Sequence, residues 1–186
     1  MKSKITIFIA VLLTLAMNSV AESSDHVLVT DSRTSTPFHY INIQGEMNIK
    51  IVQEEKQVVT VEGSQFQVDN TVTILRGDTL FVFQANVHKN ESKVLVTINI
   101  KNISLIEVTG KTNVVCEGLI NTDYLTIRTH NGAKVKLDVR ALQVDSKATG
   151  CSSIELSGFV GSVMKNTDTC AVIDTNNLDA WVTMTI

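Results

Sequence analysis

The sequence predicts an all-β protein whose main part is a β-solenoid, a stack of short strands wound coil upon coil. From residue 103 to residue 186, a polar turn followed by an alternating strand recurs about every 19 residues. Cys151 and Cys170 occupy the same position in two successive repeats, as do Ile154 and Ile173. Such a repeat cannot bury its apolar face alone, so neighbouring repeats stack. The composition agrees, since one proline and 5% aromatic residues accompany many Val, Ile and Thr, which favour strands.

The region before the repeats alternates apolar and polar residues, as strands do. Residues 22–36 are polar and without a sustained period, so we expect a flexible leader there, with at most one strand at Val27–Val29. Residues 37–186 are expected to form a single all-β domain, in which a strand and hairpin region precedes the repeats, because no change in composition divides them. The expected strands lie near residues 38–43, 47–51, 59–61, 72–74, 80–83 and 94–100, with a polar linker at 64–70 and a polar loop at 86–93.

Residues 1–21 have the three parts of a signal peptide. Lys2 and Lys4 make the start basic, residues 5–17 are apolar, and Ser19–Ala21 supplies the small residues that precede a cleavage site. The apolar stretch is short for a membrane span, and an anchor that is never removed is the alternative. We therefore expect an exported chain that begins at Glu22 and has no transmembrane segment.

The charge of the chain argues against a nucleic-acid partner. The whole chain carries a formal charge of −3. Removal of residues 1–21 takes away two lysines and no acid, which leaves 14 basic and 19 acidic residues and a charge of −5. Nucleic-acid binding depends on basic residues that neutralise phosphates, so this excess of acid disfavours it.

The cysteines are the sharpest candidates for a specific role. All three lie in the exported part of the chain, where oxidation is possible. Cys151 and Cys170, one repeat apart, would lie on adjacent rungs about 4.8 Å apart, within the Cα range of a disulfide. The alternative is a pair of unpaired small residues in turns. Cys116 is in phase with Leu137 and Leu156, so we expect it to point into the core.

A second candidate is the tripeptide Arg76-Gly77-Asp78, which some host-cell integrins recognise and which falls on the tip of an expected hairpin. The competing interpretation is ordinary turn chemistry, because Gly accepts a positive φ and Asp bonds back to the backbone. The four histidines lack metal-ligand spacing, and no Ser–His–Asp order stands out. We therefore expect no metal site, no cofactor and no catalytic residue.

The segment Phe38–Ile51, with strands on either side of Gly45, resembles the entry strand pair of a bacterial family of unknown function, the putative auto-transporter adhesin, head GIN domain. The order of later elements, Val59–Gly63, Gly77–Leu80 and Val94–Glu107, is also similar to that family. The resemblance implies an exported, all-β protein of stacked strands with an adhesive role. The sequence departs from the family at its end, where Trp181–Ile186 stops inside a strand, and an uncapped edge would invite pairing with another chain.

Together these features predict a bacterial binding or adhesion module that is secreted or belongs to the cell envelope and is not an enzyme. Its place would be the periplasm, the outer-membrane surface or the exterior, and its partner a surface polysaccharide or a protein. One alternative is a carbohydrate-active enzyme on a β-helix, which needs paired carboxylates in a groove. The other is a structural envelope protein that assembles through its C-terminal strand.

Overall fold

The computed structural model describes residues 28–34, 36–86 and 93–186, and it confirms the all-β prediction. The described strands form one mixed sheet of 13 strands, accompanied by a single short helix. No helix in these ranges is long and apolar enough to cross a bilayer. The elements are β1 (Val29–Thr34), β2 (Tyr40–Gln44), β3 (Asn48–Gln53), β4 (Val58–Gly63), α1 (Gln65–Asn70), β5 (Thr71–Arg76), β6 (Thr79–Gln84), β7 (Leu95–Ile100), β8 (Leu105–Thr109), β9 (Asn113–Asn121), β10 (Tyr124–His130), β11 (Lys134–Ala148), β12 (Ser153–Thr167) and β13 (Val172–Thr185).

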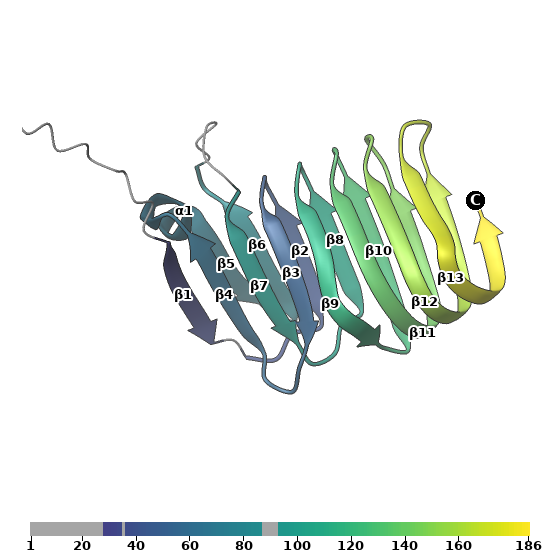
Figure 1. Ribbon diagram of the computed structural model, residues 1–186, viewed down its shortest axis with the longest axis horizontal. Coiled ribbons are helices and arrows are strands. Elements are labelled where there is room, and N and C mark those ends of the chain that lie inside the picture. The colour runs from purple at the N-terminus through teal and green to yellow at the C-terminus, as the bar shows by residue number, and fades with distance from the viewer. Residues whose placement is uncertain (1–27, 35, 87–92) are drawn as a thin grey trace, which may run out of the picture.

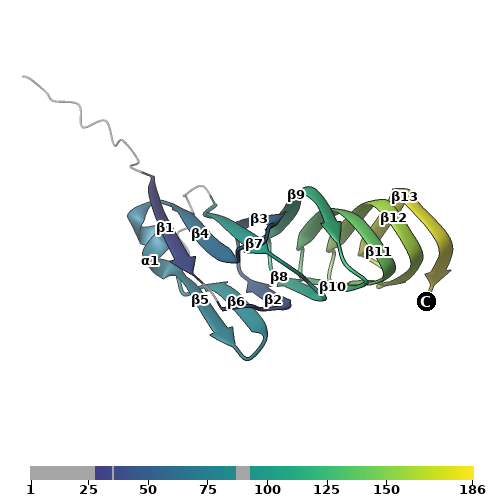
Figure 2. The ribbon, with the colours of Figure 1, turned by 90° about the horizontal axis from the view of Figure 1, so that it is seen from below.

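The sheet curls so that two walls face each other across a common core (Figures 1 and 2). One wall runs in the order β1-β4-β7-β3-β9, and the other runs β5-β6-β2-β8-β10. The long strand β11 joins them, because its first part pairs with β9 and its last part pairs with β10. β12 and β13 follow β11 along its whole length, so they bend from one wall to the other in the same way.

The spacing seen in the sequence is the register between parallel strands. Tyr124 lies opposite Gln143, and Ser153 opposite Val172, so each pair has the same separation along the chain as the two repeat cysteines. The first of these turns is longer, since Leu105 lies opposite Thr126. β9 has a bulge after Val115, and beyond the bulge the paired residues of β9 and β11 have the same separation along the chain as the two repeat cysteines. The strands from β8 onward therefore wind in nearly equal turns.

The apolar positions of successive turns meet in the core, as expected. Val135, Leu137, Ile154 and Leu156 are at most 2% exposed. Val135 is paired with Ile154, and Leu137 with Leu156, in the register of β11 and β12. Burial of each such side chain stabilises the fold by roughly 1.5–3 kcal/mol relative to an exposed position.

The N-terminal end of the core is closed by α1 and β1, which lie where a polar linker and a flexible leader were expected. The expected linker contains α1, which begins with a capping box in which Ser64 accepts from the Gln67 amide N–H. Part of the expected flexible leader is instead strand β1, which pairs with β4 along its whole length. Arg33 of β1 also bonds to the helix end, because its guanidinium donates to the carbonyl oxygens of Val68 in α1 (3.2 Å) and Thr71 at the start of β5 (2.7 Å). The expected signal peptide, residues 1–21, lies outside the described residues.

Tight turns stack along one edge of the curled sheet. Gly45 and Gly110 both have positive φ, 136° and 93°. A Cβ at Gly110 would come within 2.5 Å of the Gly45 carbonyl oxygen, so only glycine permits this approach. The hydroxyl of Thr112 also donates to that carbonyl oxygen at 2.8 Å. The backbone of one turn is therefore packed directly on the next.

Candidate functional site

Polar side chains from different strands gather on the outer face of the wall that contains β2, β8 and β10. Side chains alternate along each strand, so the apolar residues between them point into the core. The parallel register places Asn42 opposite Glu107, and Glu107 opposite Arg128. Residues far apart in the sequence are thereby brought side by side on one exposed surface.

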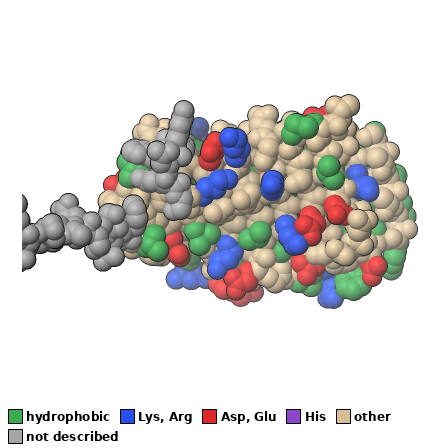
Figure 3. Space-filling model, turned by 45° about the horizontal axis from the view of Figure 1, so that its top comes forward, with side chains coloured by type: hydrophobic (Ala, Val, Ile, Leu, Met, Phe, Trp, Pro, Cys, Tyr) green, Lys and Arg blue, Asp and Glu red, His purple; other side chains and the backbone are tan. Residues whose placement is uncertain are grey.

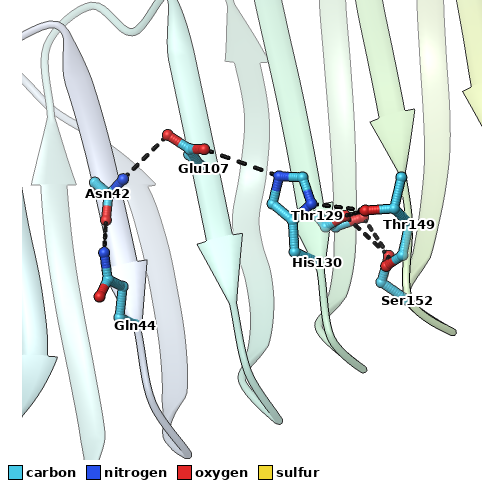
Figure 4. Close-up of polar contacts among 7 residues, drawn as sticks. All are labelled: Asn42, Gln44, Glu107, Thr129, His130, Thr149 and Ser152. Carbon is cyan, nitrogen blue, oxygen red and sulfur yellow. Dashed lines mark hydrogen bonds and ion pairs between the residues drawn. The ribbon is translucent and has the colours of Figure 1, made fainter.

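These side chains form a connected chain of contacts (Figure 4). The Gln44 amide donates to Asn42 Oδ1 at 3.0 Å, and the Asn42 amide donates to Glu107 Oε2, also at 3.0 Å. Glu107 Oε1 lies 3.8 Å from His130 Nε2, and His130 Nδ1 lies 2.6 Å from the Thr149 hydroxyl. The contacts hold the side chains in place while leaving Gln44 and Arg128 exposed to solvent.

A buried pair of hydroxyls supports this row from the inside. Thr129 Oγ1 lies 2.8 Å from Ser152 Oγ, and the Ser152 hydroxyl also contacts the Thr149 carbonyl oxygen at 2.8 Å. Thr129 and Ser152 are at most 2% exposed, and buried hydroxyls need such partners. The pair therefore fixes the turn that carries Thr149 beside His130.

The order Thr149–His130–Glu107 has the elements of a hydroxyl nucleophile, a base and an orienting carboxylate. Its geometry does not match that role. The 3.8 Å between Glu107 and His130 is longer than a hydrogen bond. The amide N–H of Gly150, next to the hydroxyl, already donates to Asp168 Oδ2 at 2.6 Å and so does not form an oxyanion site. The row is better suited to holding a polar ligand by hydrogen bonds and charge.

A shallow pocket of about 260 Å³ lies beside the row. Phe81, Phe83 and Ile74 supply apolar surface, and the amides of Asn42 and Gln44 line it as well. Pockets that combine apolar surface with a few polar groups are the usual sites of ligand recognition. We call this pocket and the adjoining polar row the outer-wall site, comprising Asn42, Gln44, Ile74, Arg76, Phe81, Phe83, Glu107, Arg128, His130 and Thr149.

The tripeptide Arg76-Gly77-Asp78 forms the turn between β5 and β6, where Gly77 has a φ of 58°. Arg76 lines the shallow pocket. The Asp78 carboxylate is occupied within the molecule, since it accepts from the His39 amide N–H at 3.0 Å and lies 2.8 Å from His39 Nδ1. The three residues therefore act separately, with Arg76 toward the pocket and Asp78 holding the start of β2.

Cys151 and Cys170 are joined by a disulfide, with their Cα atoms 4.5 Å apart. Cys151 has a φ of 57° and follows Gly150, in the tight turn that leads into β12. The Asp168 carboxylate accepts from the amide N–H groups of Gly150, Cys170 and Ala171. These bonds, chiefly the one from Gly150, lower the pKa of Asp168. The two turns are thus linked covalently and by hydrogen bonds.

Cys116 lies at the bulge of β9 and is half-buried against the core. The amide N–H of Asp138 donates to its sulfur at 3.0 Å, which gives this N–H a partner where the ladder is interrupted. Burial raises the pKa of the Cys116 thiol. Within the described ranges there is no group of three or more His, Cys, Asp or Glu side chains that could hold a metal ion; His26 and His88 fall outside them.

The sequence missed the polar row, although part of it carried a signal. His130 and Thr149 are one regular turn of the winding apart and could have been aligned. Glu107 and His130 could not, because their contact runs diagonally across the longer first turn. Asn42 could not be aligned with Glu107 from the sequence either, because β2 pairs with β8 although five strands and the helix lie between them in the chain.

The curled sheet with its two facing walls makes the chain an all-β protein built on one mixed sheet. The family described as "Putative auto-transporter adhesin, head GIN domain" matches residues 37–184, and the chain belongs to this family. The function of that family is not characterised. No curated protein sequence is significantly similar to the chain.

Solved structures share the fold. A putative adhesin from Bacteroides fragilis has a TM-score of 0.80 at 20% identity, over 85% of this chain and 75% of that one. A putative adhesin from Parabacteroides merdae has a TM-score of 0.72 at 15% identity, over 84% and 75%. A protein from Parabacteroides distasonis described as a putative lipid binding protein has a TM-score of 0.63 at 13% identity, over 85% and 77%. At these identities the likeness shows the fold alone.

Proposed function

We propose that this protein is an exported, non-catalytic binding module of the bacterial cell envelope. A surface polysaccharide or a protein is held at the outer-wall site by hydrogen bonds and by contact with its aromatic pocket. In this proposal residues 1–21 are removed on export, and residues 37–186, together with β1, which pairs with β4, act as a single domain. The stacked turns from β8 onward form a β-solenoid that supports the site.

The observation that carries the proposal is that the aromatic pocket and the polar row share Asn42 and Gln44 and so form one surface. Phe81 and Phe83 give the pocket apolar surface, while Asn42 and Gln44 line it with amides that continue into the row of Glu107. Arg128 adds an exposed cation next to Glu107. An amphipathic ligand with hydroxyl or amide groups would find both kinds of contact on a surface that is already ordered.

Export is supported by the disulfide between Cys151 and Cys170, because disulfides persist in oxidising compartments. It is supported also by the family's description as a putative auto-transporter adhesin and by the Bacteroides fragilis structure described as a putative adhesin. Acidic and basic groups are interspersed on the face seen in Figure 3. That face offers no broad basic field for nucleic acid.

Two rival functions each have one observation in their favour. A carbohydrate-active enzyme that removes acyl groups from a polysaccharide would use the Thr149–His130–Glu107 order, in which His130 Nδ1 lies 2.6 Å from the Thr149 hydroxyl. A structural envelope protein would assemble through β13, which pairs only with β12 among the described strands and exposes Val182 (50%) and Met184 (45%). Unpaired strand edges recruit other strands.

The test is a binding array of bacterial polysaccharides, host glycans and extracellular-matrix proteins, probed with the oxidised protein recovered from the exported fraction of an expressing bacterium. Asn42→Ala/Glu107→Ala removes two members of the row and should weaken binding by at least about tenfold, the loss of one to two hydrogen bonds. Lys136→Ala, an exposed change on the opposite wall, is the matched control and should bind as the parent does.

Binding that survives the double substitution would refute the outer-wall site. If nothing on the array binds, and the protein instead forms concentration-dependent assemblies that Val182→Lys/Met184→Lys abolishes, the structural function would replace this one. Circular dichroism of each variant establishes that it is folded before binding is compared.

A further inference from the structure

Large apolar side chains stand exposed along the edge where the two walls join. Tyr124 is 61% exposed, Leu142 61%, Phe159 57% and Trp181 93%. They come from four successive strands, β10 to β13. Single exposed apolar residues are ordinary. Here the only tryptophan of the chain and an exposed tyrosine and phenylalanine occur on neighbouring strands near the same bend, with Phe159 opposite Arg140 rather than opposite Leu142, and this clustering calls for a function.

In the register of the strands, a glycine lies between two of these exposed side chains. Leu142 lies between two pairs of the β11–β12 ladder, Ala141 with Val160 and Gln143 with Ser162, and is therefore opposite Gly161. By the same reasoning Gly161 is opposite Trp181 in β13. A Cβ at Gly161 would come within 2.6 Å of the Leu142 carbonyl oxygen, so the backbones are in close contact there. Leu142 and Trp181 thus stand two rungs apart, roughly 10 Å, with bare backbone between them.

Hydrogen-bonding groups follow the same edge. A groove of about 680 Å³ is lined by Tyr124 and Leu142 together with Asn121 and Arg140. Asn102 and Asn121 also line a second groove of about 800 Å³, so the two grooves adjoin along these residues. Arg140 is opposite Phe159 in the ladder, so a guanidinium and an aromatic ring are neighbours on this surface. Apolar faces and amide, guanidinium and hydroxyl groups alternate along it.

We propose that this edge, the aromatic strip of Tyr124, Leu142, Phe159 and Trp181 with Asn121 and Arg140, binds a glycan chain that runs across the coils. Sugar rings present C–H faces that pack on the electron-rich faces of aromatic rings, and hydroxyl groups that pair with amides and guanidinium. The strip rests on the proposed binding function but is a surface separate from the outer-wall site. A protein interface would instead present a contiguous apolar centre, whereas here Asn121 and Arg140 line the same groove as Tyr124 and Leu142.

Trp181 makes the proposal directly measurable, because it is the only tryptophan and its emission reports on this edge alone. The exported protein is titrated with cellohexaose, chitohexaose and xylohexaose while tryptophan emission is recorded. At least one oligosaccharide should give a saturable change and a shift to shorter wavelength. Tyr124→Ala and Phe159→Ala, which keep Trp181, should each weaken that binding roughly tenfold, while Lys136→Ala, an exposed change outside both surfaces, should leave it unchanged.

The proposal is overturned if none of the three oligosaccharides changes the emission. It is overturned also if Tyr124→Ala and Phe159→Ala bind as the parent does, or if the emission changes with protein concentration alone, which would make a second copy of the chain the occupant. Array binding that depends on Asn42 and Glu107 would then still support the outer-wall site, so the two proposals fail separately.

Discussion

Cys151 and Cys170 lie in the turns that precede the adjacent strands β12 and β13, with their Cα atoms 4.5 Å apart, and their sulfur atoms are bonded. This separation is close to the rung spacing of a sheet, about 4.8 Å, so the disulfide joins two turns at the same point of the winding. Their sequence separation of 19 is one turn of the chain. The bond therefore closes one complete turn at the C-terminal end of the fold.

Removal of this bond should destabilise the protein. Cys151→Ser/Cys170→Ser is expected to lower the free energy of unfolding by roughly 3 kcal/mol, the chain-entropy value for a loop of this size. Cys151→Gly/Cys170→Ser should lose less, because the φ of 57° at residue 151 suits glycine. Urea unfolding of the two variants and the parent, with and without reductant, measures this. A parent that is unaffected by reductant would show that the bond does not stabilise the fold.

Ile154→Ala should cost about 2–5 kcal/mol, because Ile154 is 1% exposed and its truncation leaves a cavity. Glu155→Ala is the control on the opposite face of the strand. It removes only an exposed ion pair with Lys136 (2.7 Å), and such pairs contribute little to stability. Denaturant midpoints that are equal for the two variants would contradict the inward orientation of Ile154.

Substitutions at two glycines with positive φ, Gly118 and Gly110, distinguish the cost of backbone strain from the cost of a steric clash. Gly118→Ala meets no atom within 4 Å, so its cost should be the αL penalty of about 1–2 kcal/mol. Gly110→Ala meets the Gly45 carbonyl oxygen at 2.5 Å and should cost clearly more or prevent folding. Thermal unfolding of both variants makes the comparison. Equal costs would mean that the stacked turns are not in close contact.

The Cys116 thiol should make stability depend on pH in the alkaline range. Burial raises its pKa above the ordinary value of 9.0, so the folded state favours the neutral thiol. Its contribution is fully present below that value. It is lost as the pH rises through the folded pKa, because the unfolded chain gives up the proton first. The difference in urea midpoint between the parent and Cys116→Ala, measured from about pH 8 to 10.5, should shrink or reverse toward high pH. A constant difference would contradict the burial of the thiol.

The sequence was informative where the winding is regular. Val135 and Ile154 recur at one phase and lie opposite each other in the sheet, because each turn must present its apolar side to the next. The hairpin at Gly77 was likewise local, and its turn chemistry was visible. Elements that depend on a few residues within one segment could therefore be predicted.

Other features depend on contacts that the sequence does not display. The pairing of β2 with β8 joins residues that are far apart in the chain, with a hairpin and the helix between them. β1 forms because it borders β4, and its own sequence is polar. The start of α1 did carry a signal, the Ser64–Gln67 capping box, which the polar character of the segment obscured. The polar row could not be predicted, because its members meet only after β2, β8 and β10 are aligned.

The central claim, binding at the outer-wall site without turnover, is tested most directly by measuring both events in one incubation. Each polysaccharide or protein that the array identifies is incubated with the exported protein, and the bound protein and the released reducing ends, acyl groups or peptides are quantified together. The account predicts saturable binding, loss of that binding in Asn42→Ala/Glu107→Ala, and no released product above the level of a sample without protein. Product release that disappears in Thr149→Val, His130→Gln or Glu107→Gln would contradict it and make the polar row a catalytic site.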